Sequence, residues 1–282
     1  MKSVIHSAIF FMLLFVSANS FAQQTEINVL DGVYKKTAYK EKEIIPYDHL
    51  READVFWMHR IWRELDVREK MNLFFKYPVE VNKKPQYFIH ILLESINNEG
   101  LIVYSTGDDQ FTTVMTTDEV NSIGTRVDSQ WTINPETLVE ELVVVRQEFN
   151  PENVTKFRIK EEWFFDEETS TMQVRIIGIA PLMDEYDEFG NFKFTKPMFW
   201  AYYPDLRPIL VHYEVFNPAN EAIRMSWEDI FEMRYFTSYV TKEANVFDRR
   251  IQDYYPNQLD ALLEAERIKN DIFLREHDLW NY

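Results

Sequence analysis

Apolar and polar residues alternate with a period of two from Lys156 to Ala180, and this pattern constrains the fold more than any other feature of the sequence. The alternation stops once, at the polar stretch 166–170, and then resumes through Met172, Val174 and Ile176. A period of two is typical of β-strands that bury one face. The segment therefore predicts two long antiparallel strands joined by a short turn.

Shorter patterns predict the remaining elements. Further strands are expected at 101–104, 139–145 and 209–216, and a second hairpin is expected to join 179–180 to 192–194. Apolar residues at helical spacing predict helices at 48–65, 86–97, 117–124 and 227–240. The first helix would be capped by Asp48. Helices flank a block of hairpins instead of alternating with single strands, which favours an α+β fold with a largely antiparallel sheet.

The two ends of the chain differ from its middle. Lys2, the apolar run 4–16 and the small residues of Ser20-Phe21-Ala22 predict a signal peptide, 1–22, cleaved after Ala22. The polar segment 23–45 is expected to form an extended N-terminal arm. A single α+β domain would follow at 46–256. The segment 257–282 is expected to be a C-terminal helix or tail, with an apolar stripe at Leu262, Ala265, Ile268 and Ile272.

Charge and cysteine content exclude several classes of function. Lys+Arg number 30 against 47 Asp+Glu, a net charge of -17 at pH 7. Affinity for nucleic acid comes mostly from Lys and Arg, so no nucleic-acid partner is expected, and anionic lipid is disfavoured as well. The chain has no Cys, which removes disulfides, thiolate nucleophiles and cysteine metal sites. The absence of Cys also excludes anchoring through a lipidated cysteine. No direct insertion into the membrane is expected either, so any attachment to a membrane would come through a partner.

No motif for catalysis, cofactor binding or metal binding is found. The histidines never fall at i, i+4, and the acidic cluster 184–188 lacks the spacing of an EF-hand loop, so a solvated hairpin loop is expected there. Nucleophile-elbow, phosphate-loop and dinucleotide-binding motifs are absent from the sequence. The 47 acidic residues would always allow a pair of catalytic carboxylates, so a carboxylate-dependent hydrolase stays open as an alternative.

Aromatic residues are dense without a cofactor motif, especially over 192–213. A buried core explains such density, and a protein interface is the second explanation, ahead of sugar stacking by a carbohydrate-binding module. The candidate interface residues are Trp57, Trp62, Phe199, Trp200, Tyr202 and Tyr203. A weak similarity between 54–58 and 229–233 also raises the hypothesis of an internal repeat.

Several longer stretches resemble one protein family. They are Asp31-Gly32-Val33-Tyr34, Ile45-Pro46-Tyr47, Leu50-Arg51-Glu52-Ala53-Asp54-Val55, Trp62-Arg63, Arg68-Glu69-Lys70-Met71-Asn72, Lys196-Pro197-Met198-Phe199-Trp200, Tyr203-Pro204-Asp205-Leu206-Arg207-Pro208, Met225-Ser226-Trp227-Glu228-Asp229 and Phe231-Glu232-Met233-Arg234. From about Asp31 to Tyr254 the chain is similar to the gliding motility protein family GldN, also called PorN.

The resemblance implies a non-enzymatic structural part of the type IX secretion system, which also supports gliding. Members of the family are periplasmic and form large rings with an outer-membrane lipoprotein, GldK or PorK. The ring is thought to meet the motor proteins GldL and GldM, or PorL and PorM. The resemblance thus implies copies of the chain itself and this lipoprotein as partners, and a periplasmic location at the outer membrane through the lipoprotein. It supplies no catalytic residues.

Overall fold

The structure is a computed structural model. It describes residues 41–76, 79–81, 84–133, 140–147, 149–187, 190–217, 220, 223 and 225–279. Residues 38–282 form one compact unit. The predicted signal peptide and the arm up to residue 40 lie outside the described residues.

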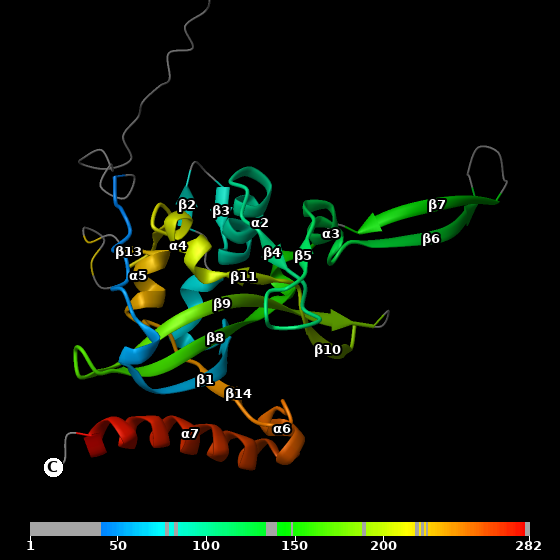
Figure 1. Ribbon diagram of the computed structural model, residues 1–282. Coiled ribbons are helices and arrows are strands. Elements are labelled where there is room, and N and C mark those ends of the chain that lie inside the picture. The colour runs from blue at the N-terminus through cyan, green and yellow to red at the C-terminus, as the bar shows by residue number, and fades with distance from the viewer. Residues whose placement is uncertain are drawn as a thin grey trace, which may run out of the picture. The chain divides into compact units, whose positions relative to one another are not determined.

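An eight-stranded antiparallel sheet organises the chain, in the order β14-β1-β8-β9-β11-β4-β5, with β10 also paired to β9. Its strands are β1 (Val55–Asp66), β4 (Val103–Tyr104), β5 (Val114–Met115), β8 (Val154–Asp166), β9 (Thr171–Tyr186), β10 (Phe192–Pro197), β11 (Trp200–Tyr202) and β14 (Tyr239–Glu243). The predicted α+β class is confirmed (Figure 1).

Three two-stranded sheets accompany the main one: β2 (Val79–Val81) with β3 (Lys84–Gln86), β6 (Arg126–Ile133) with β7 (Glu140–Gln147), and β12 (Glu214–Val215) with β13 (Met225–Ser226). The β6–β7 hairpin extends away from the main sheet (Figure 1). The helices are α2 (Phe88–Asn98), α3 (Thr117–Ser122), α4 (Tyr203–Leu210), α5 (Trp227–Glu232), α6 (Ile251–Tyr254) and α7 (Gln258–Leu279). Short 3-10 turns occur at Glu52–Asp54, Lys70–Phe75 and Pro151–Asn153.

The hairpin predicted from the period-two pattern is the centre of the sheet. Strands β8 and β9 pair from Asp166 opposite Thr171 to Ile159 opposite Ile179, with one shift of register between Glu161 and Lys160. The polar stretch between them forms the turn, and Ser170 takes the positive φ that closes it. The second predicted hairpin is also confirmed, because β10 folds back onto the end of β9.

The main core lies between the sheet and helices α2, α4 and α5. An aromatic group occupies its centre: Phe88 lies 5.4 Å from Phe75, 5.1 Å from Phe157, 4.6 Å from Trp227 and 5.4 Å from Phe231, measured between ring centroids. All five rings are buried. Helix α2 supplies Phe88 because its apolar residues recur at helical spacing and face the sheet.

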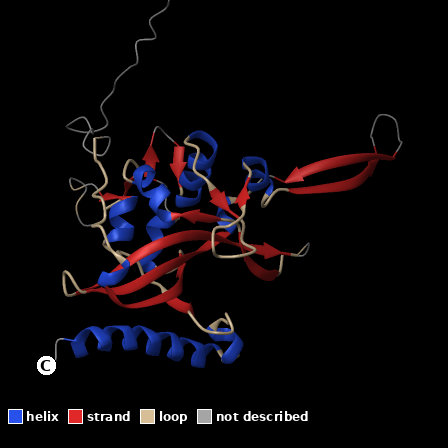
Figure 2. Cartoon of the chain, viewed as in Figure 1, coloured by secondary structure: helices blue, strands red, loops and turns tan. Residues whose placement is uncertain are grey.

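Two smaller clusters complete the core. Helix α7 packs Ala265, Ile268 and Ile272 against Ile61 of β1 and Val240 of β14. Figure 2 shows α6 and α7 beyond β1, away from the other helices. The third cluster contains Trp62, Ala180 and Trp200, with Phe111 and Tyr104 packed against it. The ring of Phe111 comes so close to Gly178 that a Cβ there would lie 2.6 Å from it, so only glycine fits.

The predicted helix over 48–65 is wrong. Asp48 caps no helix, and the segment instead forms strand β1, paired to β14 on one side and β8 on the other. Because β1 is an interior strand with contacts on both faces, successive residues such as Ile61 and Trp62 are both buried, in different clusters. Because β1 has apolar residues on both faces, these residues happened to recur at the spacing that is typical of a helix.

Two other predicted boundaries need correction. The strand expected at 209–216 is reduced to Glu214–Val215, because helix α4 occupies 203–210. Pro204 lies in the first turn of α4, a position that suits proline. The helix expected at 227–240 ends after Glu232. Arg234 adopts a left-handed conformation with φ 54°, which ends the helix, and the chain continues into β14.

The hypothesis of an internal repeat is contradicted. Residues 54–58 run from a 3-10 turn into strand β1, whereas 229–233 belong to helix α5 and its C-terminal cap. Two copies of one ancestral unit would share a secondary structure, so the similarity of these segments is a coincidence of composition.

A buried ion cluster lies where the main core meets the α7 cluster. Glu161 is fully buried, and its carboxylate accepts hydrogen bonds from Arg234 at 2.7 Å and from the Trp163 indole at 2.9 Å. Arg63, 9% exposed, lies 3.5 Å from the same carboxylate and donates to Ser238. Burial lowers the pKa of Arg63. One carboxylate thus compensates two guanidinium groups.

Candidate interaction surfaces

Four of the six predicted interface aromatics are buried in the protein's own core. Phe199 and Tyr203 are fully buried, Trp200 is 3% exposed and Trp62 is 6% exposed. The remaining two are partly exposed: Trp57 lies 5.0 Å from the Arg275 guanidinium, and the Tyr202 ring lies 5.6 Å from that of Phe111. Only Trp57 and Tyr202 therefore stay candidates for contact with a partner in this conformation.

Residues 41–50, which we call the strap, run in extended form beside α4 and α5 (Figure 1). Lys42 donates hydrogen bonds to Ser226 at 3.0 Å and to Asp229 at 2.5 Å, at the N-terminus of α5. Further along, the Asp48 carbonyl accepts a bond from Arg175 at 2.9 Å. The apolar side chain of Ile45 is 80% exposed. The strap is therefore attached mainly by polar contacts.

Arg207 of α4 is the centre of this attachment. It is 5% exposed, and its Nη2 donates both to the Ile45 carbonyl at 3.0 Å and to Glu228 at 2.7 Å. Its guanidinium lies 4.0 Å from the centre of the Tyr47 ring, and its Nε lies 3.3 Å from Glu232. Burial opposes the charged form, but the bond to Glu228 and the charges of Glu232 and Glu228 together outweigh this effect and raise the pKa of Arg207. The site therefore holds a permanent cation under the strap.

Two tyrosines share one carboxylate oxygen beside Arg207. The hydroxyls of Tyr47 and Tyr203 donate to Glu232 Oε1 at 2.6 and 3.0 Å. Burial, and then the charge of Glu232, raise the pKa of both hydroxyls, so they remain protonated donors. At the other end of the strap, burial opposes the charged form of Asp229, but the bonds from Lys42 and Ser226 prevail and lower its pKa. Both attachment points therefore stay charged at neutral pH.

We expect Tyr47→Ala to release the strap. The variant loses a hydrogen bond to a carboxylate, worth roughly 1.5–3 kcal/mol, and a cation–π contact worth roughly 0.5–2 kcal/mol. Limited trypsin digestion at Lys42 and Arg51 should therefore become at least about tenfold faster, because cleavage follows the open fraction. His49→Ala, at an exposed strap position, is the matched control. An unchanged digestion rate for Tyr47→Ala would show that other contacts hold the strap.

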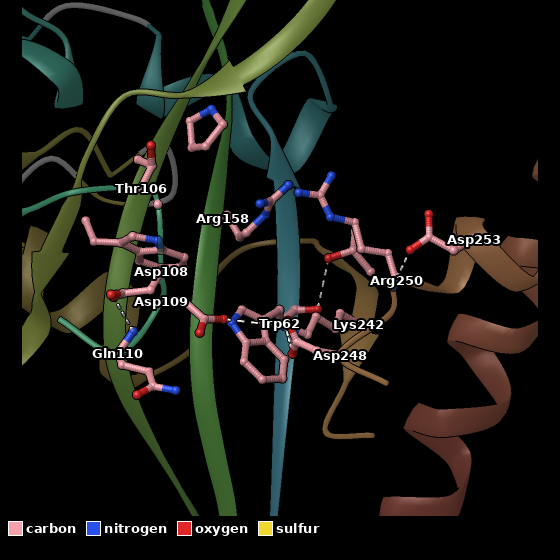
Figure 3. A pocket seen from close by; sticks show the side chains of 14 residues that line it. Trp62, Thr106, Asp108, Asp109, Gln110, Arg158, Lys242, Asp248, Arg250 and Asp253 are labelled. Carbon is pink, nitrogen blue, oxygen red and sulfur yellow. Dashed lines mark hydrogen bonds and ion pairs between the residues drawn. The ribbon is translucent and has the colours of Figure 1, made fainter. Parts of the chain in front are cut away.

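A polar pocket of about 400 Å³ lies over the Trp62 indole. Figure 3 shows the loop residues Thr106 to Gln110 on one side of Trp62 and Asp248 to Asp253 on the other. Lys242 lies 4.1 Å from the centre of the Trp62 ring and pairs with both Asp109, at 3.6 Å, and Asp248. The Trp62 N–H is buried and has no acceptor among the described residues. The lining of the pocket is therefore nearly balanced in charge, and the Trp62 N–H is enclosed beneath it.

The described residues contain neither a metal-binding group of side chains nor a helix that could cross a membrane. Asp184, from the acidic cluster 184–188, is buried in β9 and accepts hydrogen bonds from Thr155 at 2.8 Å and Thr195 at 2.6 Å, so it stabilises strand packing. Among residues with described placement, no three His, Asp or Glu side chains are grouped to hold a metal ion. Within the same residues, every helix is too short or too polar to cross a bilayer.

The strap site was missed at the sequence level, although its parts were visible. Its residues come from 42–48, 203–207 and 226–232, which are far apart in the chain. Four of the stretches that carry the family resemblance, those beginning at Ile45, Tyr203, Met225 and Phe231, meet here. If the stretches that resemble the family had been considered together, they would have indicated one shared site. They would not have shown which residues contact one another.

Comparison with known proteins supports one family. No curated protein matches the sequence. The model of the family described as gliding motility associated protein GldN matches residues 50–281, most of the chain and nearly all of its described part. The GldN family is a structural component of the gliding motility and type IX secretion machinery. The chain therefore belongs to the GldN family.

Proposed function

We propose that the protein is a non-enzymatic structural subunit of the periplasmic ring of the type IX secretion and gliding machinery. It assembles with copies of itself and with an outer-membrane lipoprotein of the GldK or PorK kind, which holds it at the outer membrane. The ring meets the motor proteins of the GldL and GldM, or PorL and PorM, kind. The observation that carries this proposal is the family match over residues 50–281.

The structure supports an assembly role in two ways. The strap is attached along α4 and α5 by named polar contacts, so the described end of the predicted arm, 41–45, is fixed on the domain. The chain also exposes several large apolar side chains on its last helix. A ring needs two different patches on each subunit, and these features lie on different elements.

The test is the mass and composition of the native particle. We expect the protein, tagged after Tyr282 and extracted gently from its own membranes, to purify in a particle far heavier than the 34.0 kDa chain, together with the lipoprotein. Deleting the protein should abolish export by the system. A lone species of about the chain's own mass would refute the ring proposal.

The polar pocket favours a second candidate function, binding of a neutral sugar in the periplasm. Its lining mixes donors and acceptors around the Trp62 ring. A carboxylate-dependent hydrolase would use the same pocket. This function requires a monomer whose melting temperature rises with oligosaccharide concentration. A flat melting temperature with millimolar oligosaccharide would remove it.

A further inference from the structure

The pocket over Trp62 crosses two rows of side chains on one face of the main sheet. In the first row, Trp62 of β1 is the register partner of Lys160 of β8 and of Lys242 of β14. In the second row, two residues further along β1, Glu64 is the register partner of Arg158. Residues two positions apart share a face and lie roughly 7 Å apart along a strand. The pocket therefore has two distinct ends.

The end at the second row, which we call the arginine end, has a surplus of positive charge. Glu64 is shared by Arg158, at 2.6 Å, and Lys156, at 3.8 Å. Arg250 donates to Asp253 at 2.8 Å through its backbone N–H, and its guanidinium has no carboxylate partner among the described residues. Figure 3 shows Arg158 and Arg250 pointing toward one another. Three cations thus face two carboxylates here, and two guanidinium groups converge on a position suited to an anion.

The end at the first row, which we call the aspartate end, has a surplus of negative charge. Asp109 lies 3.6 Å from Lys242, and Asp248 pairs with the same lysine from the opposite wall. Asp108 also lines the pocket, and the hydrogen bonds it accepts come from its own loop. Lys160 is 3% exposed, and its ammonium group donates to the Asp109 carbonyl. Three carboxylates thus face one lysine in the lining and one enclosed beneath it.

Both walls of the pocket contain a residue in the left-handed backbone region. Phe111, next to the loop 106–110, has φ 57°, and Asp248 has φ 52°. This conformation is an outlier for a residue as bulky as Phe. The Phe111 ring is held by close packing on Gly178 and lies 6.0 Å from the Trp200 ring. Strained backbone persists where its surroundings fix it, and it is concentrated at binding sites. The packing therefore holds the wall of the pocket in a preformed shape.

We infer that this pocket binds a short zwitterionic peptide, with the peptide carboxylate between Arg158 and Arg250 and the peptide ammonium group at the aspartate end. An extended chain of two residues spans about 7 Å, which matches the separation of the two rows. The volume of about 400 Å³ lies in the range of small-ligand pockets. A neutral sugar would leave both charge surpluses without a partner. Peptide binding here goes beyond the ring proposal and is independent of it.

The test is isothermal titration calorimetry of the purified mature chain, 23–282, with dialanine as the probe. We expect dialanine to bind, and N-acetyl-dialanine and dialanine amide to bind at least about tenfold more weakly, because each lacks one charge-assisted contact. Arg250→Gln should bind dialanine and its amide equally, since the carboxylate then lacks its free partner. Asp108→Asn should reduce the preference for the free amine. Arg249→Gln, at an exposed arginine outside this pocket, is the matched control.

The other outcomes would overturn the inference. They include equal binding of dialanine and its two blocked forms, and no heat from dialanine at concentrations well above millimolar. Heat from chitotriose without heat from dialanine would also overturn it and would support the neutral-sugar candidate. An equal loss of binding in Arg249→Gln and Arg250→Gln would show that net charge, and not this pocket, attracts the peptide. The ring proposal would stand in each case, because the mass of the native particle tests it separately.

Discussion

Replacing Glu161 with alanine is expected to lower the free energy of unfolding by about 3–5 kcal/mol, the usual effect of breaking a buried ion pair from one side. The variant leaves Arg63 and Arg234 without their shared carboxylate, and it also removes the acceptor of the Trp163 indole. Arg63 cannot escape into water, because its side chain is only 11% exposed. Equilibrium urea unfolding of the mature chain measures the loss.

The neighbouring residue provides the control for this prediction. Glu162 also pairs with an arginine, Arg60, but the Arg60 side chain is 40% exposed. Exposed pairs contribute about 0–1 kcal/mol, so Glu162→Ala should change stability little. Equal losses for the two variants would mean that the Glu161 cluster is solvated and does not compensate buried charge.

The second large effect is expected at Phe88. Phe88→Ala should cost about 3–5 kcal/mol, because the ring is fully buried and contacts four other rings, so its removal leaves a cavity that those rings cannot close. Urea unfolding again provides the measurement, and the near-ultraviolet circular dichroism should weaken as the aromatic packing loosens.

Phe56 offers the matched comparison. It is 68% exposed on β1, and Phe56→Ala should remain within about 0.5 kcal/mol of the parent protein. A loss below about 1 kcal/mol for Phe88→Ala would indicate that the surrounding core collapses into the vacated space.

The sequence predicted the fold well where the apolar residues of an element keep a regular spacing. Strands β8 and β9 alternate clearly, and α2 has one apolar face, so their patterns gave the correct structure. The pattern failed at β1, whose burial is decided by β14 and β8, strands that are distant in sequence. Periodicity reports the local environment of a segment, and an interior strand has two different environments at once.

The candidate sites show the same limit. Aromatic density correctly drew attention to Phe199, Trp200 and Tyr203, but composition alone cannot distinguish core from surface, and the structure buries all three. Leu262, expected in one stripe with Ala265, Ile268 and Ile272, is instead 54% exposed, because the face of α7 that is buried depends on the position of β1 and β14. The strap contacts join residues that are 127 or more positions apart, such as Asp48 with Arg175 and Ile45 with Arg207, and no local pattern encodes them.

The interior position of β1 also sets the order in which the chain can fold. β1 is the first long strand of the described sequence, but its two neighbours are completed only at Asp166 and Glu243. Trp62 and its register partner Lys242 are separated by 180 positions, so closing this pair carries a large loop entropy. A growing chain can form the β8–β9 hairpin early but must keep one edge of β1 open until synthesis is nearly finished. Completion of the sheet is therefore a late and slow event, and a chain that ends before β14 would leave a long, partly apolar edge available for aggregation.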